Sequence, residues 1–290
     1  APMANETIEV SFAGTSQFLP ASAPDFLGRE WVFAELNQWL ADPGNPRRFL
    51  LTGAPGSGKS AIARRLWDFS SGRAVPAPGA GLLHEGFLAA AHVCSARGDS
   101  MSLDPIYIAS SLAVQLAARI PPFKMALLRS VAQGRSISAK ADVGTMEAQA
   151  ELTVLRIGTL VANGVGAEES FHRFVREPLQ RIYDGGFRAP VTILFDGLDE
   201  ALGQSGKVGI IQLLARMDNM PPEVRFILTS RQDQRVTDEL SGAAGLVLTG
   251  AEHGEQNRAD LRAYIDHRLT SDGPLSKVPL PGPRDAVIEA

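Results

Sequence analysis

One stretch of this chain constrains its fold more than any other, the pattern G-x-x-x-x-G-K-S formed by Gly53, Ala54, Pro55, Gly56, Ser57, Gly58, Lys59 and Ser60. Glycines in this pattern let backbone N–H groups turn inward around a pyrophosphate. The apolar run 48–52 precedes the pattern, and a helical pattern over 59–69 follows it. A strand, a loop and a helix N-terminus in this order predict a phosphate-binding loop for a nucleotide.

The residues at the end of this loop have separate predicted roles. Lys59 is expected to reach the β- and γ-phosphates, and the Ser60 hydroxyl to ligate Mg²⁺. Ala61, the next residue of the helix, belongs to the same predicted nucleotide site. The alternative is a glycine-rich turn with an incidental lysine, and the strand–loop–helix context argues against it.

A second group of candidate residues follows the nearly continuous apolar run 191–195, which is typical of a buried parallel strand. Asp196 ends this run and is predicted to hold Mg²⁺ or one of its waters, as a Walker B carboxylate does. Asp199 and Glu200 follow within one turn, and one of them is expected to orient or deprotonate an attacking water. An acid pair favoured by the dipole of a helix N-terminus is the alternative for these two residues.

The third group is Thr229-Ser230-Arg231, at the end of the apolar run 224–228. We expect this strand to lie between the phosphate-loop strand and the Walker B strand. Arg231 would then sit at the same sheet edge, where a guanidinium can contact a γ-phosphate through a forked contact. A surface arginine after a strand is the alternative.

Composition and charge narrow the functional classes. A length of 290 residues, 44% hydrophobic and 21% charged, suits one large α/β domain with appendages. The net charge of −4 argues against a bulk electrostatic nucleic-acid binder. No apolar stretch approaches 18 residues, so no membrane span is expected. The single cysteine, Cys94, fits a buried structural thiol in a reducing compartment, and a cytoplasmic location is expected.

Alternating strand and helix patterns predict a central five-stranded parallel sheet flanked by helices, the fold of P-loop NTPases of the ASCE or AAA-like type. Residues 1–24 are expected to be an irregular lead-in, residues 25–250 the nucleotide-binding domain, and residues 251–290 the start of a helical lid and a tail. Between the phosphate loop and Asp196 the excess length is expected to be mostly helical. That expectation includes a loop over 134–145 and helices over 146–162 and 168–183.

The motifs together resemble those of NACHT domains, the signal-transducing STAND class of P-loop ATPases. The resemblance rests on the phosphate loop, on Phe26-Leu27-Gly28-Arg29-Glu30, on Asp196-Gly197-Leu198-Asp199-Glu200 and on Thr229-Ser230-Arg231, in that family's order. It covers about residues 25–270 and implies that Phe26, Leu27 and Arg29 lie beside the adenine. A helix N-terminus with Glu30 near its dipole is the alternative for this segment. The family's winged-helix and repeat-sensor domains have no counterpart here, which suggests a fragment of a longer protein, and the alanine-rich composition favours a bacterial source.

The resemblance implies an ATP-binding, slowly hydrolysing switch module with ATP/ADP and Mg²⁺ as cofactors. ADP would hold a closed form, and ATP would favour self-association of the full-length protein. Adenine is favoured because no Asn-Lys-x-Asp guanine signature is visible. Two alternatives stay open, a P-loop small-molecule kinase and a nucleotide-binding scaffold without turnover. Phosphate release without an acceptor separates the first two readings, and binding without turnover indicates the third.

Overall fold

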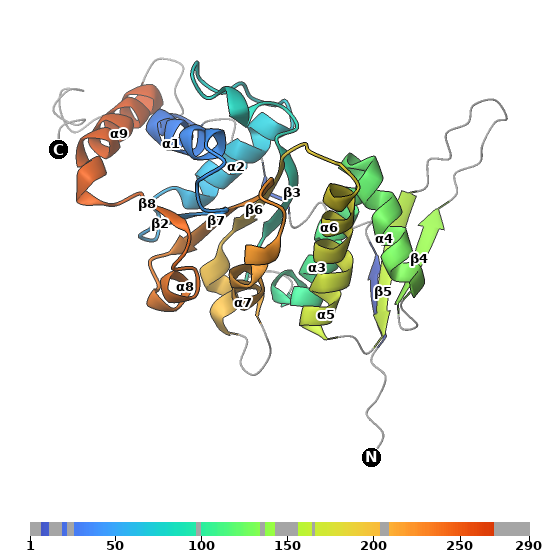
Figure 1. The fold of residues 1–290 in the computed structure, drawn as a ribbon. Helices are drawn as coiled ribbons and strands as arrows, with labels where there is room; N and C mark the ends of the chain where they lie inside the picture. The colour runs from blue at the N-terminus through green and yellow to red at the C-terminus, as the bar shows by residue number, and fades with distance from the viewer. Residues whose placement is uncertain are drawn as a thin grey trace.

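A computed structural model describes residues 7–11, 19–21, 26–96, 100–133, 137–142, 156–163, 166–203 and 209–269, and a five-stranded sheet lies at its centre (Figure 1). The strand order is β3-β6-β7-β2-β8, and every neighbouring pair is parallel. The strands are β2 (Arg48–Gly53), β3 (Leu88–Val93), β6 (Val191–Asp196), β7 (Val224–Arg231) and β8 (Ala244–Val247). This sheet confirms the predicted α/β class and is consistent with a P-loop-like fold.

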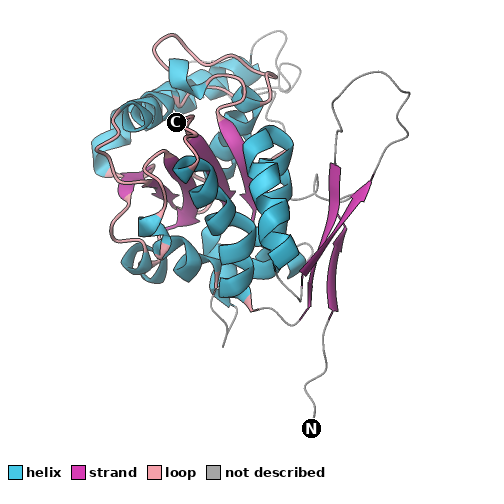
Figure 2. Cartoon of the chain, turned by 45° about the vertical axis from the view of Figure 1, so that its right-hand side comes forward, coloured by secondary structure: helices cyan, strands magenta, loops and turns pink. Residues whose placement is uncertain are grey.

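Helices cover both faces of the sheet, as the sequence patterns predict (Figures 1 and 2). One face carries α1 (Glu30–Ala41) and α2 (Lys59–Ser70). The other carries α3 (Pro105–Arg119), α4 (Pro121–Gln133), α5 (Ala167–Phe171), α6 (Glu177–Asp184), α7 (Ile210–Ala215) and α8 (Gln234–Glu239). A π-helical turn, His172–Arg176, joins α5 to α6, so the helix predicted over 168–183 is nearly continuous. Beside α1 lies α9 (Gly254–Leu269), a helix within the segment predicted to start a helical lid (Figure 1).

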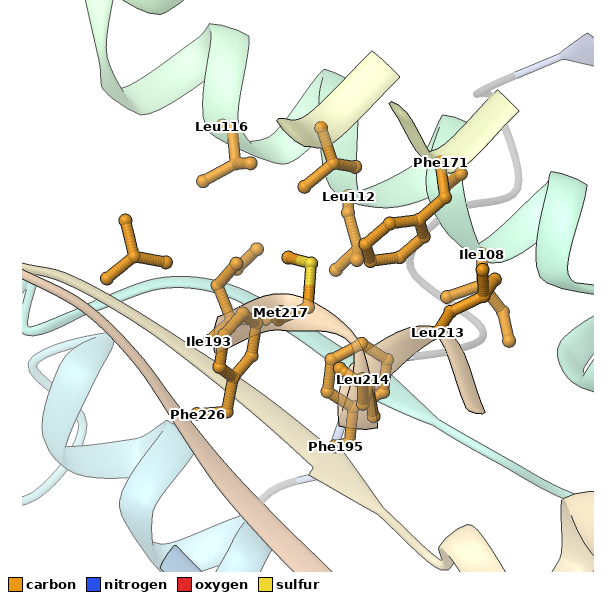
Figure 3. Close-up of a cluster of buried hydrophobic side chains, with 14 of the residues drawn as sticks. Ile108, Leu112, Leu116, Phe171, Ile193, Phe195, Leu213, Leu214, Met217 and Phe226 are labelled. Carbon is orange, nitrogen blue, oxygen red and sulfur yellow. The ribbon is translucent and has the colours of Figure 1, made fainter. Parts of the chain in front are cut away.

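The central strands explain why helices are needed on both faces. All six residues of β6 are buried, and side chains alternate between the two faces of a strand. Ile193 and Phe195 therefore pack with α3 and α7 (Figure 3). Leu194 packs with α1 and α2. Each such side chain contributes about 1.5–3 kcal/mol when it leaves water. The two layers hold the carboxyl ends of β2, β6 and β7 side by side.

A second sheet overturns part of the sequence prediction (Figure 2). It is antiparallel, has the order β1-β5-β4, and lies beside α3 and α4. Its strands are β1 (Thr7–Ser11), β4 (Ile137–Asp142) and β5 (Arg156–Asn163).

Three expectations are therefore corrected. The lead-in over 1–24 contains a strand, the loop over 134–145 contains another, and the carboxyl half of the helix predicted over 146–162 is a strand. The sequences of β1 and β4 alternate apolar and polar residues, and β5 has the β-branched content of a strand. β5 pairs with β4, which is close to it in the chain, and with β1, which is far away, and the helical spacing over 146–162 indicated neither pairing. Residues 146–155 lie outside the described residues.

Among the described helices, none has both the length and the apolar character needed to cross a bilayer. Of the predicted lid and tail over 251–290, the structure describes the part up to Leu269.

Candidate functional site

The loop between β2 and α2 has the backbone that its glycines predict. Gly56 and Gly58 adopt φ values of 79° and 95°, in the left-handed region that other residues avoid. At Gly53 a Cβ atom would lie 2.6 Å from Ser57 Oγ, so a larger residue there would require the Ser57 side chain to shift. Ala54 and Pro55 are exposed at the tip of the loop. The loop thus places the N-terminus of α2 at the carboxyl end of β2.

Lys59 lies across the inside of this loop. Its Nζ donates to the carbonyl oxygens of Gly53 at 2.8 Å and Ala54 at 2.9 Å. Burial lowers the pKa of Lys59 below its usual value, and the charge of Arg231 adds to that shift while Asp199 and Asp196 oppose it. The Lys59 ammonium group is therefore close to Asp196, Asp199 and Arg231, three charged residues that the sequence analysis assigned to the same site.

The two predicted metal ligands meet at the end of β6. Ser60 Oγ donates to Asp196 Oδ1 at 3.2 Å, and Thr229 Oγ1 donates to the same oxygen at 2.5 Å. Asp196 is 5% exposed; burial raises its pKa, and the hydrogen bonds from Thr229 and Ser60 oppose the rise. A hydroxyl and a carboxylate oxygen about 3 Å apart suit two adjacent ligands of octahedral Mg²⁺, which takes its other ligands from water and phosphate. Among the described residues, no cluster of three His, Cys, Asp or Glu side chains offers another metal site.

A tight turn after Asp196 separates the two acids that the sequence left undecided. Gly197 has φ 81°, and a Cβ there would lie 2.9 Å from the Cys94 carbonyl oxygen. The 3-10 helix Leu198–Gly203 then turns Asp199 towards the end of β7 and Glu200 towards the end of β3. Glu200 Oε2 accepts the N–H of Ala96 at 2.6 Å. The neighbouring acids therefore have different partners.

Arg231 occupies the predicted position. β7 lies between β2 and β6, and Arg231 is the register partner of Gly53, the first residue of the phosphate-loop motif. Its Nε lies 3.1 Å from Asp199 Oδ2, and its backbone N–H donates to Asp199 Oδ1 at 2.8 Å. The Arg231 side chain is 51% exposed, so the guanidinium lies at the open edge of the site.

A cavity of about 520 Å³ adjoins the loop and is lined by Phe26, Leu27, Arg29, Gly56, Ser57, Gly58 and Ala61. The structure thus brings the base-side candidates next to the phosphate-loop residues. Four further lining residues come from α9 and were missed by the sequence analysis: Asn257, Asp260, Leu261 and Tyr264. Leu261 and Tyr264 are large apolar side chains that stay exposed, and their place on an otherwise polar helix was the signal available.

Arg29 joins this cavity to both the loop and α9. It has φ 66°, a left-handed conformation that is rare for a residue with a side chain. Its guanidinium donates to Ser57 O at 3.2 Å and to Asn257 Oδ1, and it lies 3.8 Å from Asp260 Oδ2. Trp31 Nε1 also donates to Asp260, at 3.0 Å. The Phe26–Glu30 segment is therefore a wall of the cavity, beyond its role at the start of α1.

Comparison with known proteins gives one family match. Residues 29–157 match the family model described as Nephrocystin 3, N-terminal, a NACHT-related region. The match covers less than half of the chain and includes the phosphate loop, but it ends before Asp196. No curated protein matches the chain.

Proposed function

We propose that this chain is the nucleotide-binding, slowly hydrolysing ATPase module of a NACHT-type STAND protein. One observation carries the proposal. Lys59, the Ser60–Asp196 pair and Arg231 converge at the carboxyl edge of β2, β6 and β7. Ligands of open α/β sheets bind at this edge, and a cavity adjoins it. The NACHT-related family match over 29–157 supports the same assignment.

In this proposal the phosphates lie against the N-terminus of α2, where backbone N–H groups and the helix dipole favour anions. Lys59 exchanges its loop carbonyls for the β- and γ-phosphates. Mg²⁺, held by Ser60 and Asp196, would neutralise charge that develops on the phosphate oxygens. Glu200 uses one oxygen to accept the Ala96 N–H and has the second available to orient the attacking water. Arg231 contacts the γ-phosphate, which ADP lacks.

The base is proposed to be adenine, seated in the cavity between Phe26, Leu27 and Arg29 and the residues of α9. Nucleotide exchange then acts as a switch, because a tenfold difference in affinity between two conformations shifts their balance by about 1.4 kcal/mol. We propose that ATP favours self-association of a longer, cytoplasmic, bacterial protein. Hydrolysis returns the module to its ADP form.

The purified chain provides the test. Calorimetric titration with Mg-ATP and Mg-ADP should give saturable binding of both nucleotides, and a phosphate assay without added acceptor should show slow release. Transfer to an added acceptor with little release alone would favour the kinase, and tight binding without release would favour the scaffold. Binding of neither nucleotide to the folded chain would contradict the proposal.

A further inference from the structure

Asp199 and Glu200 are adjacent acids at the carboxyl edge of the sheet, and the structure separates their partners. β6 lies between β3 and β7, and the turn at Gly197 starts a 3-10 helix above the end of β6. Leu198 is fully buried and anchors this helix. As a result Asp199 reaches the β7 side and Glu200 the β3 side.

Both carboxylate oxygens of Asp199 contact Arg231, one through a hydrogen bond and one through an ion pair. Oδ1 accepts the backbone N–H at 2.8 Å, and Oδ2 lies 3.1 Å from Nε. Asp199 is 13% exposed while Arg231 is 51% exposed, so the acid is the enclosed partner and the arginine the accessible one. Pairing through Nε leaves the terminal Nη1 and Nη2 of the guanidinium as donors for a second anion.

The pair lies beside the phosphate-loop lysine, because Arg231 is the register partner of Gly53, whose carbonyl oxygen accepts from Lys59 Nζ at 2.8 Å. A group that Lys59 holds in the loop is therefore near the guanidinium. Glu200 has a different arrangement, since a single oxygen is bonded to Ala96 N–H.

We propose that Asp199 is a positioning residue, which holds the Arg231 guanidinium against the phosphate loop and so sets the preference for nucleoside triphosphate over diphosphate. This inference rests on the proposed nucleotide site. It assigns the water-orienting role to Glu200 alone of the two acids. The inference predicts that removing the Asp199 charge weakens triphosphate binding. Electrostatics alone predicts the opposite, because removing a negative charge near an anion would by itself strengthen anion binding.

The test is a double-mutant cycle on Asp199→Asn and Arg231→Ala, with Kd values for Mg-ADP and for a non-hydrolysable ATP analogue. Arg231→Ala should weaken the analogue about ten- to a hundredfold and ADP less than about twofold. Asp199→Asn should weaken the analogue about three- to tenfold, again sparing ADP, and should add nothing in the Arg231→Ala background. Asp238→Asn removes an exposed acid from α8 and should leave both Kd values unchanged.

Single-turnover hydrolysis of ATP adds the readout that separates positioning from catalysis. If Asp199 acts through Arg231, Asp199→Asn has no further effect on the rate once Arg231 is alanine. A large loss of rate from Asp199→Asn in both backgrounds would make Asp199 the base and overturn the inference. Equal weakening of ADP and the analogue, or tightening of both, would overturn it as well.

Wild-type protein that binds neither nucleotide would overturn the proposed function and this inference together. If the wild type binds nucleotide but the effects of Asp199→Asn and Arg231→Ala are additive, the inference alone is overturned. Melting curves of each variant show that a loss of affinity comes from a folded chain.

Discussion

Two cavities of about 520 Å³ lie at opposite ends of the five-stranded sheet. The first adjoins the phosphate loop at the carboxyl end, and the second is lined by residues at the amino ends of β3, β6 and β7, including Phe87, Pro190 and Glu223. At the amino end Arg225 donates to the carbonyl oxygens of Trp39 at 2.7 Å and Asp42 at 2.6 Å.

The charged groups at the two ends thus differ in exposure and in their partners. Arg225 is buried and tied to backbone carbonyls, as structural cations are, whereas Arg231 is half exposed beside a helix N-terminus. Cavity volume alone therefore does not identify a binding site. Accessible hydrogen-bond donors that converge on one point are the better criterion. The predictions below test whether the two ends differ as this comparison requires.

The largest expected effect is on turnover at the carboxyl end. Glu200→Gln should leave ATP affinity within about twofold and slow hydrolysis about 10²–10⁴-fold, because the amide cannot accept a proton from water. Phosphate release under single-turnover conditions measures it. Glu239→Gln, an exposed change on α8, is the matched control. A wild-type rate in Glu200→Gln would remove Glu200 as the base.

Lys59→Ala should abolish measurable ATP binding, a loss of at least about 100-fold, because charge-assisted contacts to two phosphates disappear. A fluorescent ATP analogue or calorimetry measures the affinity, and circular dichroism checks the fold. Lys124→Ala on α4 is the control, since this lysine lies on a helix away from the loop. Unchanged affinity in folded Lys59→Ala would remove the distinction between the two ends.

Tyr264→Ala sharpens the comparison within the carboxyl-end site. Tyr264 lines the cavity beside Arg29 and is 40% exposed. Losing its partial burial against a base should weaken ATP and ADP equally, by about fivefold or 1 kcal/mol. Equal losses would distinguish this base-side residue from Arg231, whose effect should fall on the triphosphate alone. A loss confined to ATP would contradict the base-side placement.

Arg225→Met should have the smallest effect on nucleotide binding, with both Kd values within about twofold of wild type. The same variant should lose about 2 kcal/mol of stability, since two charged hydrogen bonds to carbonyls disappear and their acceptors are left buried. Calorimetric melting would show a Tm lower by about 3 °C. A tenfold weaker affinity for ATP would mean that the amino end takes part in binding.

The sequence predicts best what is contiguous. The phosphate loop, its strand and its helix lie in one stretch, and the position of β7 between β2 and β6 was expected from the sheet order of P-loop NTPases. The pairing of Asp199 with Arg231 could not be predicted, because it depends on which way the turn at Gly197 rotates the chain. The cavity-lining residues of α9 were missed for a similar reason, since the contact between Arg29 and Asn257 joins residues more than 200 positions apart.

The second sheet could not be predicted either, because its strands pair in a way that the local sequence does not indicate. β1 is the register partner of β5, so Thr7 lies opposite Asn163. These two segments lie far apart in the chain, so nothing local to either one indicates their pairing. Local spacing favoured a helix over 146–162, whereas residues 156–163 form a strand that pairs with both β4 and β1.

The backbone amide hydrogens of α9 are expected to exchange with solvent early. This helix, Gly254–Leu269, has no buried side chain. Among the described residues, it is held to the rest of the chain by hydrogen bonds from Arg29 and Trp31 and by the bond from Asn257 to Leu248 O at 2.7 Å. A segment without apolar burial opens locally at little free-energy cost. In deuterated water α9 should therefore exchange its amide hydrogens well before β6 and β7, whose protection reports global unfolding.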